Sequence, residues 1–193
     1  MEVTSTPRFV RALRAIHEQK RGRTELEGAE AGFTLIELMV VLLIMAILLA
    51  IAIPTFLGVK SGAYDRSTQS NLTNALTSAK AGYANGGSYA TAASSEAAIL
   101  TSAEPNLSFL TAAPATAGGS SVVVGVSTDG QELVLVGWSQ SGICWAAEDN
   151  EGTTSGLTGA DTAQGDFYEH WSYGTGTLCN VANISTSGWH STY

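Results

Sequence analysis

Glu37 is a carboxylate inside the most apolar stretch of this 193-residue chain. The stretch from Phe33 to Ile53 reads FTLIELMVVLLIMAILLAIAI, and Thr34 is its only other polar residue. An acidic side chain costs about 2.5–3.5 kcal/mol at the centre of a membrane helix, and less near a helix end. The position of Glu37 therefore calls for a compensating positive group.

Cleavage of the peptide bond between Gly32 and Phe33 would supply that group. The new α-amine stands four residues before Glu37, within helical reach of this carboxylate or of the same carboxylate in a neighbouring copy. A helix N-terminus also favours negative charge, by a few tenths to about 1 kcal/mol. When identical helices bundle, the amine of one chain and Glu37 of another can neutralise each other and fix the axial register. The alternative is that Glu37 is simply a polar residue near the start of a membrane anchor.

The apolar stretch is long enough to cross a membrane, since about 20 helical residues span a hydrocarbon layer of about 30 Å. Residues 1–32 hold six of the nine Lys and Arg residues, whereas Lys60 and Arg66 are the only two in the thirty residues after the stretch. The positive-inside bias predicts a cytoplasmic N-terminus and an exported remainder. A secretory signal peptide is the alternative, because residues 50–52 (AIA) form an A-x-A-like cleavage site.

The helix is predicted to continue past Pro54, which should kink it because proline supplies no amide donor and its ring meets the carbonyl one turn back. Beyond Pro54, apolar residues recur at helical spacing and polar residues occupy the opposite side, so this half is predicted to be amphipathic. The apolar positions are Phe56, Val59, Ala63, Leu72, Leu76, Ala79 and Tyr83; the polar ones include Asp65, Arg66, Ser70 and Asn74. Residues 85–87 (NGG) predict the end of the helix, since glycine adopts the left-handed conformation that terminates helices.

The second half of the chain carries the signals of an antiparallel sheet. Residues 88–119 predict a loop with a short helix near Glu96–Leu100. Ser121–Ser127 and Glu132–Trp138 are rich in β-branched and apolar residues, and the residues between them suit a tight hairpin. A third strand is predicted at Ile143–Ala147. The rest contains a stretch rich in Gly and Thr and an aromatic patch before Cys179, which predicts an irregular end; the fold class is α+β.

The two cysteines, Cys144 and Cys179, fit neither CxxC nor zinc-ligand spacing. If the domain is exported, a disulfide is the simplest interpretation. It would close a loop of about 36 residues and stabilise the fold by about 3–4 kcal/mol through the entropy of the unfolded chain. Two buried free thiols are the alternative.

No catalytic, cofactor-binding or metal-binding constellation is predicted. The three histidines have no nucleophile motif nearby. Oxygen ligands of the kind that calcium prefers are offered by Asp149, Asn150, Glu151, Asp161 and Asp166, but without the DxDxDG spacing, so a solvated acidic loop is favoured. Residues 33–193 hold 3 basic and 12 acidic residues, a net charge of −9, which argues against nucleic acid as a partner. The aromatic residues Trp171, Tyr173, Trp189 and Tyr193 could form an adhesive or inter-subunit patch, or could pack under the disulfide loop.

The stretch from Gly32 to Pro54 closely resembles the N-terminal methylation motif of type IV pilins and type II secretion pseudopilins. In that family a prepilin peptidase cuts after the glycine that matches Gly32 and methylates the new N-terminal residue, here Phe33. The helix glutamate of the family matches Glu37, and its kink-forming proline matches Pro54. The rest of the chain is similar to the family in layout, with a long helix, an antiparallel sheet packed on it and a C-terminal region closed by two cysteines.

The resemblance implies four segments. Residues 1–32 are a cytoplasmic leader removed by the peptidase, 33–53 a transmembrane and assembly helix, 54–85 the amphipathic half of that helix, and 86–193 a β-rich head with a disulfide-closed end. The implied function is that of a structural subunit, without enzymatic activity, of a type IV pilus that serves adhesion, motility or DNA uptake. The alternatives are a secretion pseudopilin and a minor tip pilin that binds a receptor.

The implied partners are other copies of the chain in a helical homopolymer, the prepilin peptidase, the inner-membrane assembly machinery and, before assembly, the membrane itself. The implied location is a single-pass cytoplasmic-membrane precursor that becomes a cell-surface filament.

Overall fold

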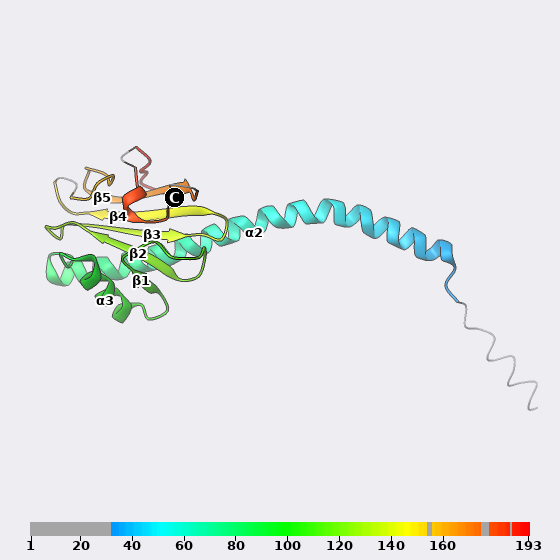
Figure 1. The fold of residues 1–193 in the computed structure, drawn as a ribbon, viewed down its shortest axis with the longest axis horizontal. Helices are drawn as coiled ribbons and strands as arrows, with labels where there is room; N and C mark the ends of the chain where they lie inside the picture. Colours follow the sequence, from blue (N-terminus) through cyan, green and yellow to red (C-terminus); the bar gives the residue numbers. More distant parts are fainter. Residues whose placement is uncertain (1–31, 154–155, 175–177, 186) are drawn as a thin grey trace, which may run out of the picture. The chain divides into compact units, whose positions relative to one another are not determined.

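A computed structural model describes residues 32–153, 156–174, 178–185 and 187–193. The chain divides between Ile53 and Pro54 into two units, which are considered separately below. The helix α2 (Leu35–Gly86) contributes to both, and all the strands belong to the second. The α+β class predicted from the sequence is confirmed (Figure 1).

Helix α2 is 52 residues long and contains Pro54 within it. It ends where the sequence predicts, because Gly87 takes a positive φ of 75° and its amide donates to the carbonyl of Tyr83 at 2.6 Å. The predicted kink at Pro54 stays a prediction. Within the second unit, the side chains of α2 that are buried are Thr68, Leu72, Ala75, Leu76 and Ala79.

A five-stranded sheet packs on this part of α2, with its strands in chain order. The strands are β1 (Ser108–Leu110), β2 (Ser121–Val126), β3 (Glu132–Trp138), β4 (Ile143–Asn150) and β5 (Gly165–Ser172). β1 runs parallel to β2, and every other neighbouring pair is antiparallel. The tight β2–β3 connection uses Gly130 at φ 71°, where a side chain would also meet the carbonyl oxygen of Tyr89 at 2.6 Å.

One face of the sheet packs on α2 and on the helix α3 (Ala93–Ala103). The core there joins Leu72 and Leu76 of α2 to Leu133 and Leu135 of β3, and Leu100 of α3 completes it. The helix comes close to β3 at Gly137, where an added Cβ would lie 2.7 Å from Cγ2 of Thr68. Helix and sheet therefore meet without space for a larger residue at that position.

The opposite face of the sheet carries a second core, which the chain after β4 covers. Val134 and Val136 of β3 pack there against Ile184 and Trp189, and the disulfide forms part of the same cluster. A short 3-10 helix, η1 (Val181–Asn183), lies in this covering segment. Because both faces of β3 are covered, the strand is apolar along its length instead of alternating.

The structure differs from the sequence-based prediction in four places. The short helix is longer than predicted and is now α3. Strand β1 lies in a segment predicted to be loop, and β4 continues to Asn150, beyond the predicted Ala147. The aromatic patch predicted as an irregular end is the edge strand β5. Strand β5 is only half-buried, so its apolar and polar residues alternate weakly. The periodicity of the sequence therefore does not indicate a strand there.

Candidate assembly site

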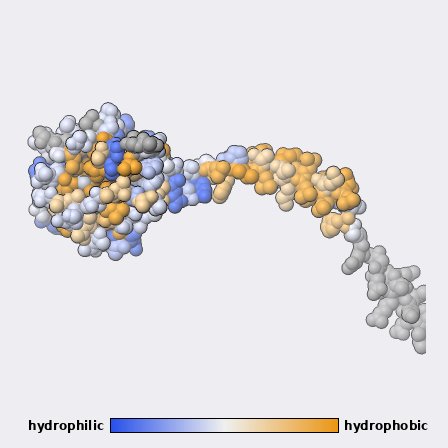
Figure 2. Space-filling view, in the orientation of Figure 1, coloured by the Kyte–Doolittle hydropathy of each residue, from blue (hydrophilic) through white to orange (hydrophobic). Residues whose placement is uncertain are grey.

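The N-terminal half of α2 exposes its apolar side chains throughout. Every residue from Phe33 to Ile53 is exposed, including Phe33 at 92% and Ile51 at 68%. The hydrophobic colouring of this part of the helix is continuous in Figure 2. By length and composition the helix could cross a membrane, and its most apolar window has no buried residue. A surface of this kind requires lipid or other apolar helices around it.

A capping box begins this helix. Thr34 precedes the first residue of α2, and its backbone amide and hydroxyl both donate to Oε2 of Glu37, at 2.9 and 2.7 Å. The Glu37 amide donates back to the Thr34 hydroxyl at 3.2 Å. These reciprocal bonds give hydrogen-bond partners to backbone amides that otherwise have none at the start of a helix.

The role of Thr34 was missed in the sequence analysis, although the T-x-x-E spacing of a capping box signals it. Glu37 thus has a local partner within its own chain, in addition to the amine that cleavage would create. Gly32, Phe33 and Glu37 lie together at the start of α2, whereas Pro54 lies some five turns further on. Residues 1–31 of the predicted leader lie outside the described residues.

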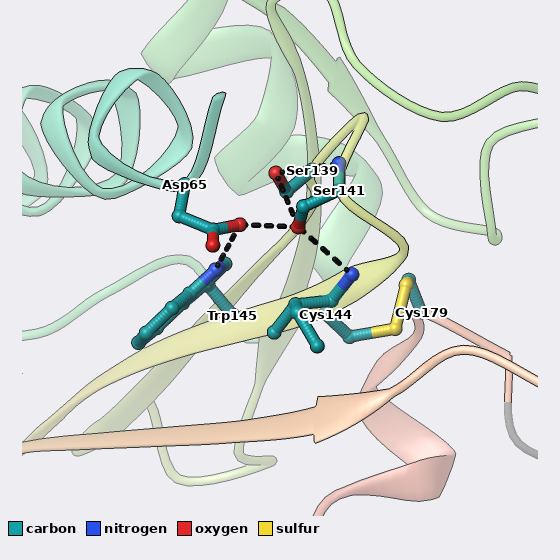
Figure 3. The surroundings of a disulfide bond; sticks show 7 residues. Asp65, Ser139, Ser141, Cys144, Trp145 and Cys179 are labelled. Atoms are coloured by element: carbon teal, nitrogen blue, oxygen red, sulfur yellow. Dashed lines mark hydrogen bonds between the residues drawn. A yellow bond between two sulfur atoms is a disulfide. The ribbon is translucent and has the colours of Figure 1, made fainter. Parts of the chain in front are cut away.

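In the second unit, Asp65 ties α2 to the turn between β3 and β4. Its Oδ1 accepts hydrogen bonds from the hydroxyl of Ser141 and from the indole of Trp145, the latter at 3.3 Å (Figure 3). The Ser141 hydroxyl is also 3.0 Å from that of Ser139 and accepts the amide of Ile143 at 3.3 Å. This polar junction fixes the helix at one end of the sheet.

The disulfide lies beside this junction (Figure 3). Cys144 of β4 is bonded to Cys179, and both residues are fully buried. The bond joins chain positions 35 residues apart and holds the segment before η1 against the second face of the sheet. The covering segment is thereby attached to the central part of the fold.

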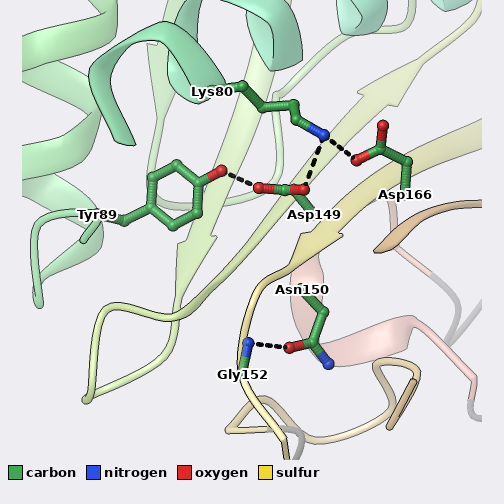
Figure 4. A network of polar contacts seen from close by, with 6 residues as sticks. All are labelled: Lys80, Tyr89, Asp149, Asn150, Gly152 and Asp166. Atoms are coloured by element: carbon green, nitrogen blue, oxygen red, sulfur yellow. Dashed lines mark hydrogen bonds and ion pairs between the residues drawn. The ribbon is translucent and has the colours of Figure 1, made fainter. Parts of the chain in front are cut away.

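A second polar cluster ties α2 to the other end of the sheet (Figure 4). Lys80 of α2 lies 2.6 Å from Asp166 of β5 and 3.1 Å from Asp149 of β4, and the hydroxyl of Tyr89 donates to Asp149. Burial raises the pKa of Asp149, while Tyr89 and Lys80 act against that rise. Partial desolvation lowers the pKa of Lys80, but its bonds to Asp166 and Asp149 outweigh this effect and raise it.

The residues that could offer oxygen ligands to calcium have other structural roles. Asp149 and Asp166 bind Lys80 on the helix side of the sheet. Asn150 accepts the amide of Gly152 at 2.9 Å, and Asp161 accepts that of Ala163 at 2.8 Å, so both stabilise their own loop. Within the described ranges, no group of three or more His, Cys, Asp or Glu residues is placed to hold a metal ion.

The aromatic residues of the C-terminal region divide between packing and exposure. Trp189 is buried in the second core, and Trp171 packs against that core. Tyr173 stacks on Trp138 with ring centroids 4.0 Å apart and keeps 40% of its surface exposed. Tyr193 is 43% exposed and lies 4.0 Å from the ring of Tyr168. Packing therefore accounts for the tryptophans, while the two tyrosines are partly exposed.

Of the two histidines in the second unit, one makes a ring contact and the other a backbone bridge. The ring of His170 stacks on Trp145 with centroids 4.9 Å apart, and His190 forms a β-bridge with Tyr168.

Comparison with known families identifies the start of the chain. Residues 28–53 match the family model of the prokaryotic N-terminal methylation motif, which is characteristic of type IV pilins and pseudopilins. Neither curated proteins nor solved structures gave a match to the chain. The matched range contains Gly32, Phe33 and Glu37 and ends at Ile53, so it covers the exposed apolar half of α2. The motif and the apolar helix together fit a membrane-anchored precursor.

Proposed function

We propose that this chain is the structural subunit of a type IV pilus, cleaved between Gly32 and Phe33 and polymerised through the N-terminal half of α2. The supporting observation is that the methylation motif runs directly into a helix whose apolar side chains are exposed from Phe33 to Ile53. Such a helix needs lipid before assembly and other helices afterwards. Identical helices of other copies are the partners that this motif implies.

The precursor is anchored in the cytoplasmic membrane with its N-terminus in the cytoplasm. Prepilin peptidase removes residues 1–32 and methylates Phe33, and the assembly machinery transfers the subunit from lipid into the filament. In the filament, the amine of Phe33 neutralises Glu37 of a neighbouring copy, so that a charge that is costly in lipid favours association. The polar clusters of the second unit bond helix, sheet and loops to one another, which supports a structural role.

The second candidate is a pseudopilin of a type II secretion system, since the matched motif is characteristic of both classes. A pseudopilin forms a short periplasmic fibre, whereas a pilin forms a long surface fibre. Recovery of the chain in fibres sheared from the cell surface at its normal expression level supports the pilus, and its confinement to the periplasm supports the pseudopilin.

The role of Glu37 in assembly can be separated from its role in capping. Glu37→Gln removes the charge but keeps an oxygen acceptor that a capping box also accepts. Thr34→Ala removes the capping hydroxyl but keeps the charge. We expect both variants to be cleaved, and fibre recovery to fall at least about tenfold for Glu37→Gln because its partner amine loses its counter-charge.

Thr34→Ala serves as the matched control and should retain most of its fibres. Processing is read from the mass of the membrane-bound chain and assembly from the sheared surface fraction, measured for both variants in the same cells. Fibre formation by Glu37→Gln at the wild-type level contradicts the proposed role of the carboxylate.

A further inference from the structure

The charges of the second unit are separated between its two ends. One end, here called the near end, contains the β3–β4 turn, where Ser141 bonds to Asp65 of α2. The other, the far end, contains the β2–β3 turn, where Gln131 accepts a hydrogen bond from Tyr83 of α2 at 2.7 Å. Since Asp65 precedes Tyr83 by 18 residues along one helix, the two ends lie about 27 Å apart along α2.

Two cations lie at the near end. Lys60 and Arg66 are exposed on α2. Both ion pairs found among the described residues are made by Lys80, and not by these two cations. The Lys60 ammonium lies 5.4 Å from the centre of the Tyr64 ring. Oδ1 of the neighbouring Asp65 accepts bonds from Ser141 and Trp145, so this one negative charge is turned toward the sheet and the two cations outnumber it. The near end therefore presents positive charge to solvent.

Two carboxylates lie exposed at the far end. Asp129 accepts bonds from the Ser127 hydroxyl at 2.6 Å and the Gln131 amide at 3.1 Å, which lower its pKa and keep it ionised. The amide of Glu151 donates to the Gln131 carbonyl at 2.9 Å, so Glu151 lies beside the same turn. The last turn of α2 adds no basic residue, and its carbonyls present the negative end of the helix dipole.

Parallel polymerisation brings unlike ends together. In a filament whose helices all point the same way, copies related by axial displacement make heterologous contacts, in which two different surfaces of the chain meet. The near end of one copy then faces the far end of another. The third cation of residues 33–193, Lys80, is already bound to Asp149 and Asp166, so Lys60 and Arg66 are the cations left for such a contact.

We propose that Asp129 and Glu151 of one copy dock against Lys60 and Arg66 of a neighbouring copy, and that this contact sets the axial stacking of the heads. The inference rests on the proposed filament. Each exposed charge pair is weak and screened by salt, but the contact repeats at every subunit. Charge complementarity of this kind selects one arrangement of partners more than it adds affinity.

Two double variants test the contact with little change in shape. D129N/E151Q removes both far-end charges, and the amide oxygen of Asn can still accept the bonds that form the turn. K60Q/R66Q removes both near-end charges. The first variant changes the net charge of residues 33–193 from −9 to −7, and the second changes it to −11.

This difference separates docking from general repulsion between acidic subunits. Docking predicts that both variants lower the fraction of subunits retained in sheared fibres by about threefold or more in dilute buffer, and that salt then has little further effect. The quadruple variant should be no worse than either double variant. Repulsion instead predicts more fibre for D129N/E151Q and less for K60Q/R66Q, and that result would overturn the inference.

Charge exchange provides a second test. R66E places like charges at the contact and should lose fibres, and adding E151K should restore them. The control is the thermal unfolding temperature of each solubilised variant. If it equals that of the wild type, a damaged head is excluded as the cause of fibre loss. If the wild type forms fibres normally and every variant forms as many, this inference alone is contradicted. If the wild-type chain forms no fibre, the proposed function is contradicted as well.

Discussion

Replacing Glu148 with Gln should stabilise the head at alkaline pH. Glu148 is fully buried in β4, and its Oε2 accepts the amide of Asp161 at 2.9 Å. Its Oε1 has no hydrogen-bond partner among the described residues. Burial raises the pKa of this carboxyl to about 8, and the nearby charges of Glu132 and Asp161 add to the rise, against the opposing effect of the Asp161 amide.

The size of the effect follows from proton linkage. Below pH 4.5 the carboxyl is protonated in both the folded and the unfolded chain, so its contribution to the free energy of unfolding is constant. Between pH 4.5 and about 8 the unfolded chain releases the proton while the folded chain keeps it, and stability falls as the pH rises. The upper limit of this loss is about 5 kcal/mol, and screening reduces the expected value to about 2–3 kcal/mol.

Gln cannot ionise, and its amide can still accept the Asp161 hydrogen bond and donate one. The two proteins should therefore be similar in stability at pH 4.5, and Glu148→Gln should exceed the wild type by about 2–3 kcal/mol at pH 8. The assay is urea unfolding of the detergent-solubilised chain, with the disulfide intact, followed by tryptophan fluorescence. The exposed Glu151→Gln serves as control and should follow the wild type. If the free energies of unfolding of Glu148→Gln and wild type changed in parallel between pH 4.5 and pH 8, the argument would be refuted.

Three further predictions use the same unfolding assay at pH 7. Replacing both cysteines with serine should lower the free energy of unfolding by about 3–4 kcal/mol, because the disulfide restricts the unfolded chain over 35 residues. Leu72→Ala should cost about 3–5 kcal/mol, since the side chain is fully buried between α2 and the sheet, and an unchanged stability would exclude that packing. Lys80→Met should cost about 1–3 kcal/mol at pH 7 by leaving the buried Asp149 without its cation. Burial raises the pKa of that carboxyl above its ordinary value, so the loss should become smaller as the pH falls, and a loss that does not change with pH would contradict the ion pair.

Much of the fold could be predicted from local sequence. The apolar run, the NGG stop and the two valine-rich strands each carry a strong signal in a few adjacent residues, and β3 has the bounds predicted for it. The helix α2 was likewise predicted to within two residues at its start and one at its end. These features depend on periodicity and on glycine, which act over short distances.

The remaining features depend on contacts between distant segments. Strand β1 is three residues long and is defined by its pairing with β2, so its own sequence has little signal. The apolar positions Phe56 and Val59 were grouped with the buried stripe of α2, yet they are 67% and 72% exposed, because burial begins only at Thr68, where the sheet covers the helix. Spacing shows which side of a helix is apolar but not how far its partner extends.

At the candidate site, the roles given to Gly32, Phe33 and Glu37 stay predictions, and the capping role of Thr34 was missed. The charged cluster of Lys80, Asp149 and Asp166 was also missed, because its members are separated by as many as 86 residues in the chain. Such clusters form only when the fold brings the strands to the helix.

The most direct test of the proposed function is the intact mass and N-terminal residue of the chain recovered from fibres sheared off the cell surface. The proposed function predicts a chain that begins at N-methylated Phe33. A chain that begins near Ile53, or an intact chain from Met1 confined to the membrane, would contradict it.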